Sequence, residues 1–192
     1  LLPVIGGIMV GSRLTGRFPQ ARVAVAAGLA VMAAGMVAGA AAGADTGYGW
    51  VAAWVTVAGL GLGIAMPPAM NAALGALTRE RSGVGSGLIQ AMRQLGGALG
   101  VAILGAALNG GYRDALPAGA PEAARGSVSA GVAWAAGPAR AAFAHGRTRS
   151  LLVAAAIAVV GAVVAVVALP RVPKAPVLAE SQHDHIPAER VA

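Results

Sequence analysis

Long runs without charged residues constrain this chain more than any other feature of its sequence. Residues 23–44, 50–77 and 150–169 contain no Asp, Glu, Lys or Arg, and residues 82–112 contain only Arg93. A helix crosses the hydrocarbon core of a bilayer, about 30 Å thick, with about 20 apolar residues. Inside that core every backbone amide needs an internal hydrogen bond, and the runs are too continuous for the alternating strands of a barrel. We therefore expect an all-α integral membrane protein with several spans.

The charged residues support lipid as the solvent and exclude nucleic acid as a partner. Only 11% of the residues are charged, whereas soluble domains carry about 25%. The formal net charge is +7, but the basic residues lie between the apolar runs and not in one basic patch or arm. The chain has no cysteine, which excludes disulfides and thiolate metal sites.

The apolar runs predict five helices. We expect them at about residues 1–12, 22–43, 50–77, 84–108 and 150–169. The first is expected to be only the end of a membrane helix, because the chain starts with Leu1 and is apolar from there without a basic leader region. We therefore expect four complete membrane helices plus the end of one more, within a larger protein. Residues 109–149 are expected to form a long loop, and residues 171–192 a polar, disordered tail.

The positions of Lys and Arg predict the orientation in a cell membrane. Three Arg lie in residues 13–22 and two in 78–82, whereas the turn at 44–49 has none. Cytoplasmic segments carry an excess of Lys and Arg. We therefore expect 13–22, 78–82 and the C-terminus in the cytoplasm, and 109–149 outside. The five Arg of that long loop are spread more thinly.

Small and kinking residues mark two of the expected helices. Gly28, Gly35, Gly39 and Gly43 share one side of the helix at 22–43, which suits close helix packing. Such spacings also arise by chance in a chain with 29 glycines. Pro67 and Pro68 interrupt the helix at 50–77 and predict a kink or break near residues 64–68.

Polar side chains distinguish the helices that could line a path from those that face lipid. The candidates for the path are Asn71, Gln90, Arg93 and Gln94. The helix at 150–169 has no polar side chain after Ser150, so we expect it at the lipid boundary.

Arg93 is the most informative of these residues. If its helix enters the membrane at Val84, Arg93 lies about 13 Å deep, where an unpaired Arg costs at least about 2.5 kcal/mol. It would then face a wet cavity or a partner. Alternatively the helix starts above the membrane and Arg93 extends to the lipid phosphates. Both alternatives are compatible with transport.

Catalytic and metal-binding patterns are missing from the spans. None of the five expected spans contains a carboxylate, an HExxH motif or a Ser/His arrangement, so we expect neither an enzyme nor a cofactor. A proton-coupled carrier normally needs an ionisable group near its path, and these spans supply no carboxylate. His183, Asp184 and His185 lie in the polar tail without the spacing of a known metal-binding motif, so we expect no metal site there.

Three segments resemble one transporter family. They are Gly11-Ser-Arg13-Leu-Thr-Gly-Arg17-Phe-Pro-Gln-Ala-Arg22, the helix Gly59–Asn71, and the run from Gly83 through Arg93-Gln-Leu-Gly-Gly-Ala-Leu-Gly100. They are similar to the fourteen-helix drug:proton antiporters (EmrB/QacA-type) of the major facilitator superfamily, over most of residues 1–170. Gly11, Arg13, Arg17 and Arg22 match the family's cytoplasmic loop motif. Gly16 replaces its usual Asp, and Pro19 and Gln20 replace a Gly and an Arg, which puts a charge-relay role in doubt.

The resemblance implies the C-terminal part of a helix bundle. The complete protein would export hydrophobic or cationic drugs or antibiotics by alternating access, with the proton gradient as energy source. The coupling carboxylates would lie on the missing N-terminal helices, and the helices at 50–77 and 84–108 would line the cavity. The alternative is a stand-alone small membrane protein, or an inactive truncated transporter that acts only through a partner.

Overall fold

Every secondary-structure element that we describe is helical. The computed structural model describes residues 2–43, 46–75 and 82–169. The elements are α1 (Leu2–Leu14), η1 (Thr15–Arg17), α2 (Ala21–Ala40), α3 (Tyr48–Gly75), α4 (Ser82–Ala115), α5 (Glu122–Gly126), α6 (Val128–Trp134) and α7 (Ala136–Ala168).

Four of these helices are long and apolar enough to cross a membrane. They are α2, α3, α4 from Gly85 onward, and α7. Helix α1 has 13 residues, fewer than the roughly 20 that a complete crossing needs. This confirms the expectation of an all-α protein with four membrane-length helices.

Most of the expected connection at 109–149 is helical. Helix α4 continues to Ala115 and α7 already begins at Ala136, with α5 and α6 between them. The apolar runs mark where helices can sit in lipid, but both helices extend beyond the apolar part. The tail at 171–192 and residues 78–81 lie outside the described residues.

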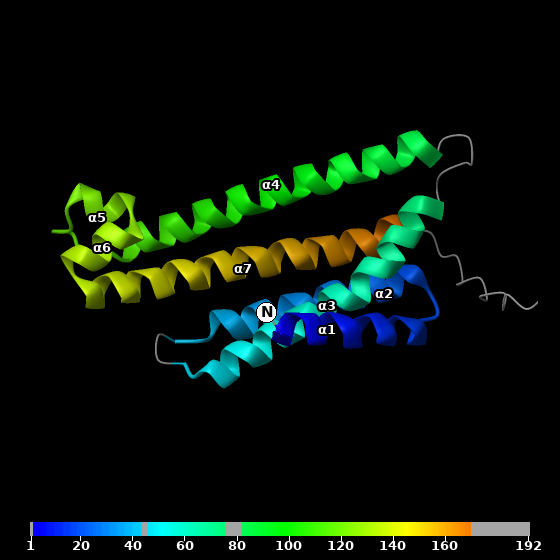
Figure 1. The fold of residues 1–192 in the computed structure, drawn as a ribbon, viewed down its shortest axis with the longest axis horizontal. Helices are drawn as coiled ribbons and strands as arrows, with labels where there is room; N and C mark the ends of the chain where they lie inside the picture. The colour runs from blue at the N-terminus through cyan, green and yellow to red at the C-terminus, as the bar shows by residue number, and fades with distance from the viewer. Residues whose placement is uncertain (1, 44–45, 76–81, 170–192) are drawn as a thin grey trace, which may run out of the picture.

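The helices pack side by side in a fixed order. Helix α3 packs against both α1 and α2, and α7 packs against both α2 and α4. Helix α4 therefore lies at one edge of the assembly, with only slight contact to α3. Figure 1 shows that α2, α3, α4 and α7 alternate in direction, so that η1 lies at one end and α5 and α6 lie at the other.

Interleaved glycines bring α1 and α2 against α3 at the level of the backbone. A methyl group added at Gly7 would overlap the carbonyl oxygen of Thr56, and one at Gly63 would overlap that of Ile8. On the other side, Gly61 lies against the backbone of Gly28. The sequence Gly59-Leu-Gly-Leu-Gly63 thus places two glycines toward α1 and the one between them toward α2.

The predicted glycine face of α2 is a packing face along most of its length. Gly28, Gly35 and Gly39 are buried. A Cβ atom at Gly35 would meet the backbone of Ala58, and one at Gly39 would meet the ring of Trp54. Gly43 lies beyond the end of α2 and is exposed, so it takes no part in this contact.

Candidate functional site

The polar residues of α4 lie on a helix that the other described helices leave largely uncovered. Gln90, Arg93 and Gln94 are all exposed. None of the residues in the most apolar window of α4 is buried, whereas 39% of the corresponding window of α2 is buried. Because α4 packs almost only on α7, most of its circumference has no helix against it among the described residues.

The depth of Arg93 follows from the register between α4 and α7. The Ser150 hydroxyl donates a hydrogen bond of 3.0 Å to the carbonyl oxygen of Leu104, which sets these two residues at one level. Ser150 also begins the charge-free run that ends at residue 169. Arg93 stands eleven residues before Leu104, and in antiparallel helices it is therefore level with Gly161, eleven residues after Ser150.

This register favours the deeper of the two placements expected for Arg93. Eleven residues of helix span about 16 Å, which is half the thickness of a hydrocarbon core of about 30 Å. A side chain at mid-depth is far from the phosphates on both sides. Within the described part of the chain, the Arg93 guanidinium has no hydrogen-bond or ion-pair partner.

The exposed surface of α7 is chemically different from that of α4. Past Ser150, its exposed large side chains are all aliphatic: Leu152, Ile157, Val159, Val160, Val163, Val164, Val166 and Val167. Aliphatic side chains are compatible with lipid, whereas a guanidinium at the same depth is not. The exposed surface of α4 is also largely apolar, with Leu88, Leu95 and Leu99 among its exposed side chains, and it differs from that of α7 by the stripe that bears Gln90, Arg93 and Gln94.

Asn71 lies apart from the polar residues of α4. It lines a small cavity of about 70 Å³ together with residues of η1, of the segment after it and of α2: Thr15, Phe18, Gln20, Ala21, Ala24 and Pro68. The structure therefore brings Asn71 to the segment between α1 and α2. It does not bring it together with Gln90, Arg93 and Gln94, as a single path lined by all four residues would require.

Helix α3 continues through both prolines, so the predicted alternative of a break is wrong. Pro68 has no N–H and cannot bond to the carbonyl oxygen four residues earlier, which belongs to Ile64. The Thr15 hydroxyl lies 3.3 Å from the Ile64 oxygen and 3.2 Å from the Gly11 oxygen, so its single hydrogen is shared between these two acceptors. A side chain from η1 thereby offers the Ile64 carbonyl a donor that the α3 backbone lacks.

Thr15 is a structural residue of this site that sequence reasoning missed. It is the one buried polar residue among the described residues, with 8% of its surface exposed. The sequence does indicate that a donor is needed, because a proline inside a membrane helix leaves a carbonyl acceptor that another group must satisfy. It does not indicate that the donor is a residue 49 positions earlier.

The loop-motif residues divide into one packing residue and three cations. Gly11 is buried, and a Cβ atom there would overlap the Leu60 carbonyl oxygen of α3. Arg13 and Arg17 are exposed, and the Arg22 Nε donates to the Gln20 Oε1 at 2.8 Å. Among the described residues, none of these cations forms an ion pair.

No metal-binding arrangement is present in the part of the chain that the structure describes. His183, Asp184 and His185 lie outside those residues, so the expectation that they form no metal site stays a prediction. Comparison of the chain with protein-family models, with curated proteins and with solved structures gives no match. The resemblance to drug:proton antiporters therefore rests on the residues of the three segments quoted above.

Proposed function

We propose that this chain is part of a proton-driven efflux transporter of the major facilitator superfamily. The complete protein would export hydrophobic or cationic drugs or antibiotics across the cell membrane by alternating access. The observation that carries the proposal is the exposed polar face of α4, with Arg93 level with the middle of the apolar run of α7. The resemblance of the three sequence segments supports the family.

A charged side chain in lipid is costly. An Arg at the centre of a bilayer costs at least about 2.5 kcal/mol, and intramembrane charges almost always face a bundle interior or a water-filled cavity. The described residues provide no partner for Arg93. The face that bears Gln90, Arg93 and Gln94 is therefore proposed to border an aqueous path, closed on its far side by helices outside this chain.

The charge of Arg93 also restricts its role. A fixed positive charge repels a cationic substrate at close range, so direct recognition of such a substrate by Arg93 is disfavoured. A guanidinium instead suits a carboxylate on a facing helix, where the pair could exchange partners as protons bind and leave. No carboxylate lies in the central part of α4 or α7, so that acid is proposed to lie elsewhere in the transporter.

A second candidate rests on the same open face. A small membrane protein that acts only through a partner would also leave one helix uncovered, and the partner's helices would bury Arg93. The two candidates differ in what covers α4, which is water in a transporter and protein in an obligate complex.

The decisive test is export by the complete gene product in an efflux-deficient host. We expect Arg93→Ala to lower the export rate of an amphipathic cationic dye about tenfold, since an interaction of a charged group is worth about 1.5–3 kcal/mol. Arg93→Lys should retain part of the activity, because it keeps the charge. The matched control is Val163→Ala, on the aliphatic surface of α7 at a similar depth. Unchanged export by Arg93→Ala at equal protein level would contradict the proposal.

Thiol labelling separates the two candidates, because the chain has no cysteine of its own. With a transporter, a membrane-impermeant maleimide should modify Arg93→Cys at least about ten times faster than Val163→Cys, since the reagent and the thiolate both need water. An obligate complex predicts that neither position reacts. The mass of the endogenous product adds a check, since fourteen spans with loops give roughly 50 kDa, against 18.6 kDa for this chain.

A further inference from the structure

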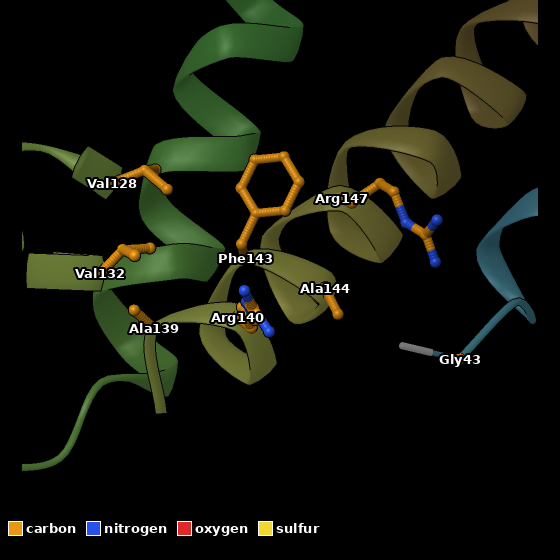
Figure 2. Close-up of a pocket in the computed structure, with 8 residues that line it drawn as sticks. All are labelled: Gly43, Val128, Val132, Ala139, Arg140, Phe143, Ala144 and Arg147. Carbon is orange, nitrogen blue, oxygen red and sulfur yellow. The ribbon is translucent and has the colours of Figure 1, made fainter. Parts of the chain in front are cut away.

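A cavity of about 360 Å³ lies at the end of the molecule that carries α5 and α6. Figure 2 shows that its walls come from α6, from the first turns of α7 and from Gly43 after α2. A water molecule takes up about 30 Å³ in the liquid, so the space admits a group of many atoms. The lining side chains are Val128, Val132, Ala139, Arg140, Phe143, Ala144 and Arg147.

One face of α7 supplies the charged and aromatic part of this wall. Arg140 stands three and four residues before Phe143 and Ala144, and Arg147 stands four and three residues after them, which places all four on one side of a helix. Val128 and Val132, four residues apart on α6, lie on the other side of the Phe143 ring from Arg147 (Figure 2). The cavity is thus apolar at one end and cationic along α7.

Arg147 is held in place but has binding capacity left. Its Nη2 donates to the carbonyl oxygen of Ala42, and the hydroxyl of the adjacent Thr148 donates to that of Ala40 at 3.1 Å. These bonds satisfy carbonyls at the C-terminal end of α2, which have no partner within their own helix. The Nε of Arg147 is buried and has no partner in the described structure. This nitrogen has almost no accessible surface, so a ligand in the cavity would meet the outer nitrogens of the Arg147 guanidinium.

Among the described residues, the lining of the cavity carries two guanidinium groups and no carboxylate. Arg149, two residues from Arg147, shows the contrast, because it forms an exposed ion pair of 2.7 Å with Asp114 on the side of α4. Planar guanidinium groups bind phosphate and carboxylate through paired hydrogen bonds.

The cavity begins at the expected level of the lipid headgroups. Arg147 precedes Ser150, the start of the charge-free run, by three residues, or about 5 Å of helix. The headgroup layer adds about 5–7 Å on each side of the hydrocarbon core. Arg140 lies about 10 Å further along the helix, so the cavity extends from this layer toward water.

We propose that this cavity binds an anionic amphiphile, with its phosphate or carboxylate against Arg140 and Arg147 and its apolar part against Phe143, Val128 and Val132. The anion takes the free donors of Arg147 and the exposed guanidinium of Arg140. The proposal does not depend on the transport function, because Arg147 lies fourteen residues of α7, or about 21 Å, from the level of Arg93.

Binding to the purified full chain in neutral detergent tests the proposal by native mass spectrometry. We expect the chain to retain one dioctanoyl phosphatidylglycerol and to bind it at least about tenfold more tightly than dioctanoyl phosphatidylcholine. Arg140→Gln and Phe143→Ala should each weaken this binding about tenfold, the first through the anion and the second through the apolar part. Arg147 is left unchanged, because it also holds the end of α2.

Arg149→Gln is the matched control, since it removes the same charge on the same helix but faces α4. It should bind phosphatidylglycerol within about twofold of the wild type. An equal loss in Arg149→Gln and Arg140→Gln would overturn the proposal, because it would show a general charge effect. Equal retention of the two lipids by the wild type would overturn it as well.

Two further ligands identify the source of the amphiphile. Hexyl phosphate represents a soluble anion with an apolar tail, and inorganic phosphate represents the anion alone. Competition by hexyl phosphate at a concentration similar to that of the lipid assigns the site to soluble amphiphiles, and its failure to compete assigns the site to membrane lipid. Both results support the site, whereas equally good competition by inorganic phosphate would overturn the role of the apolar wall.

Discussion

The two halves of this molecule hold their helices together by different means. Helices α1, α2 and α3 meet backbone to backbone through glycines. Helix α4 meets α7 closely at only one end, where Gly111 lies against Gly146 and the Tyr112 side chain, 1% exposed, fills the space beneath α5 and α6. Past Leu104 toward its N-terminus, α4 has mainly exposed side chains.

The difference separates a closely packed part of the molecule, α1 to α3, from a part with mainly exposed side chains, the N-terminal part of α4. In lipid, helices associate through close packing and polar contacts, because lipid tails are as apolar as the side chains. The glycine half uses the first means along its whole length. The α4–α7 pair combines one glycine crossing with hydrogen bonds, and leaves the polar side of α4 free for other contacts.

The largest effect should come from a methyl group in the glycine half. Gly61→Ala places a Cβ atom into the backbone of Gly28 and Met32, so we expect a loss of about 3 kcal/mol in the free energy of unfolding in micelles. The matched change Gly97→Ala on α4 has no atom within 4 Å and should not destabilise. Similar losses for both variants would show that the two halves do not differ in packing.

The second effect concerns the hydroxyl that bridges η1 and α3. Thr15→Val should cost about 1–2 kcal/mol, because the Ile64 carbonyl then has no donor, and Thr15→Ser should restore most of the stability. In a Pro68→Ala background, the new N–H of residue 68 can bond to Ile64, so the cost of Thr15→Val should nearly vanish. A double-mutant cycle of unfolding free energies measures this, and additivity would refute the shared hydrogen bond.

A smaller loss of unfolding free energy is expected at the Tyr112 side chain, at the end where α4 and α7 are in close contact. The Tyr112 hydroxyl donates to the Ala124 carbonyl oxygen at 3.1 Å. Tyr112→Phe keeps the ring and removes this bond, so we expect a loss of about 1 kcal/mol. Hydrogen exchange should show faster opening of α5 and α6 with α2 and α3 unchanged. Equally faster exchange in α2 would mean that the two halves unfold as one unit.

The smallest effect is expected at the exposed ion pair of the same end. The side chains of Arg149 and Asp114 are 52% and 67% exposed, and such surface pairs contribute little. Arg149→Ala should change the unfolding free energy by less than about 0.5 kcal/mol. A larger loss that does not depend on salt would indicate that this ion pair is one of the main contacts that hold α4 against α7.

The sequence predicts the helices well because apolar length is a direct requirement of the bilayer. The runs at 23–44, 50–77 and 150–169 each lie largely within a helix of the structure. The helical connection between Ala115 and Ala136 was not predicted, because its stability comes from Tyr112 and from Arg125, which donates to the carbonyls of Pro117, Ala118 and Ala120. Such contacts depend on the fold and leave no periodic pattern.

The candidate site was predictable in its residue types but not in its geometry. Polarity within an apolar helix singles out Arg93 and Gln90, and they do lie on an open face. The separation of Asn71 from them depends on which helices are neighbours, and the sequence does not specify that order. The level of Arg93 along α7 needed the register between Leu104 and Ser150, which a single hydrogen bond reveals.

The interleaved glycines of α3 have a consequence for insertions and deletions. One residue turns a helix by about 100°, so adding or removing a residue before Gly59 would rotate all three glycines away from both neighbouring helices at once. A single substitution in this segment changes the contact with one neighbouring helix, whereas a change of length alters the contacts with both. An extra residue in the open part of α4 would meet no such double packing penalty, so folding should tolerate it there better than in α3, while export should suffer because the insertion turns Arg93 by the same angle.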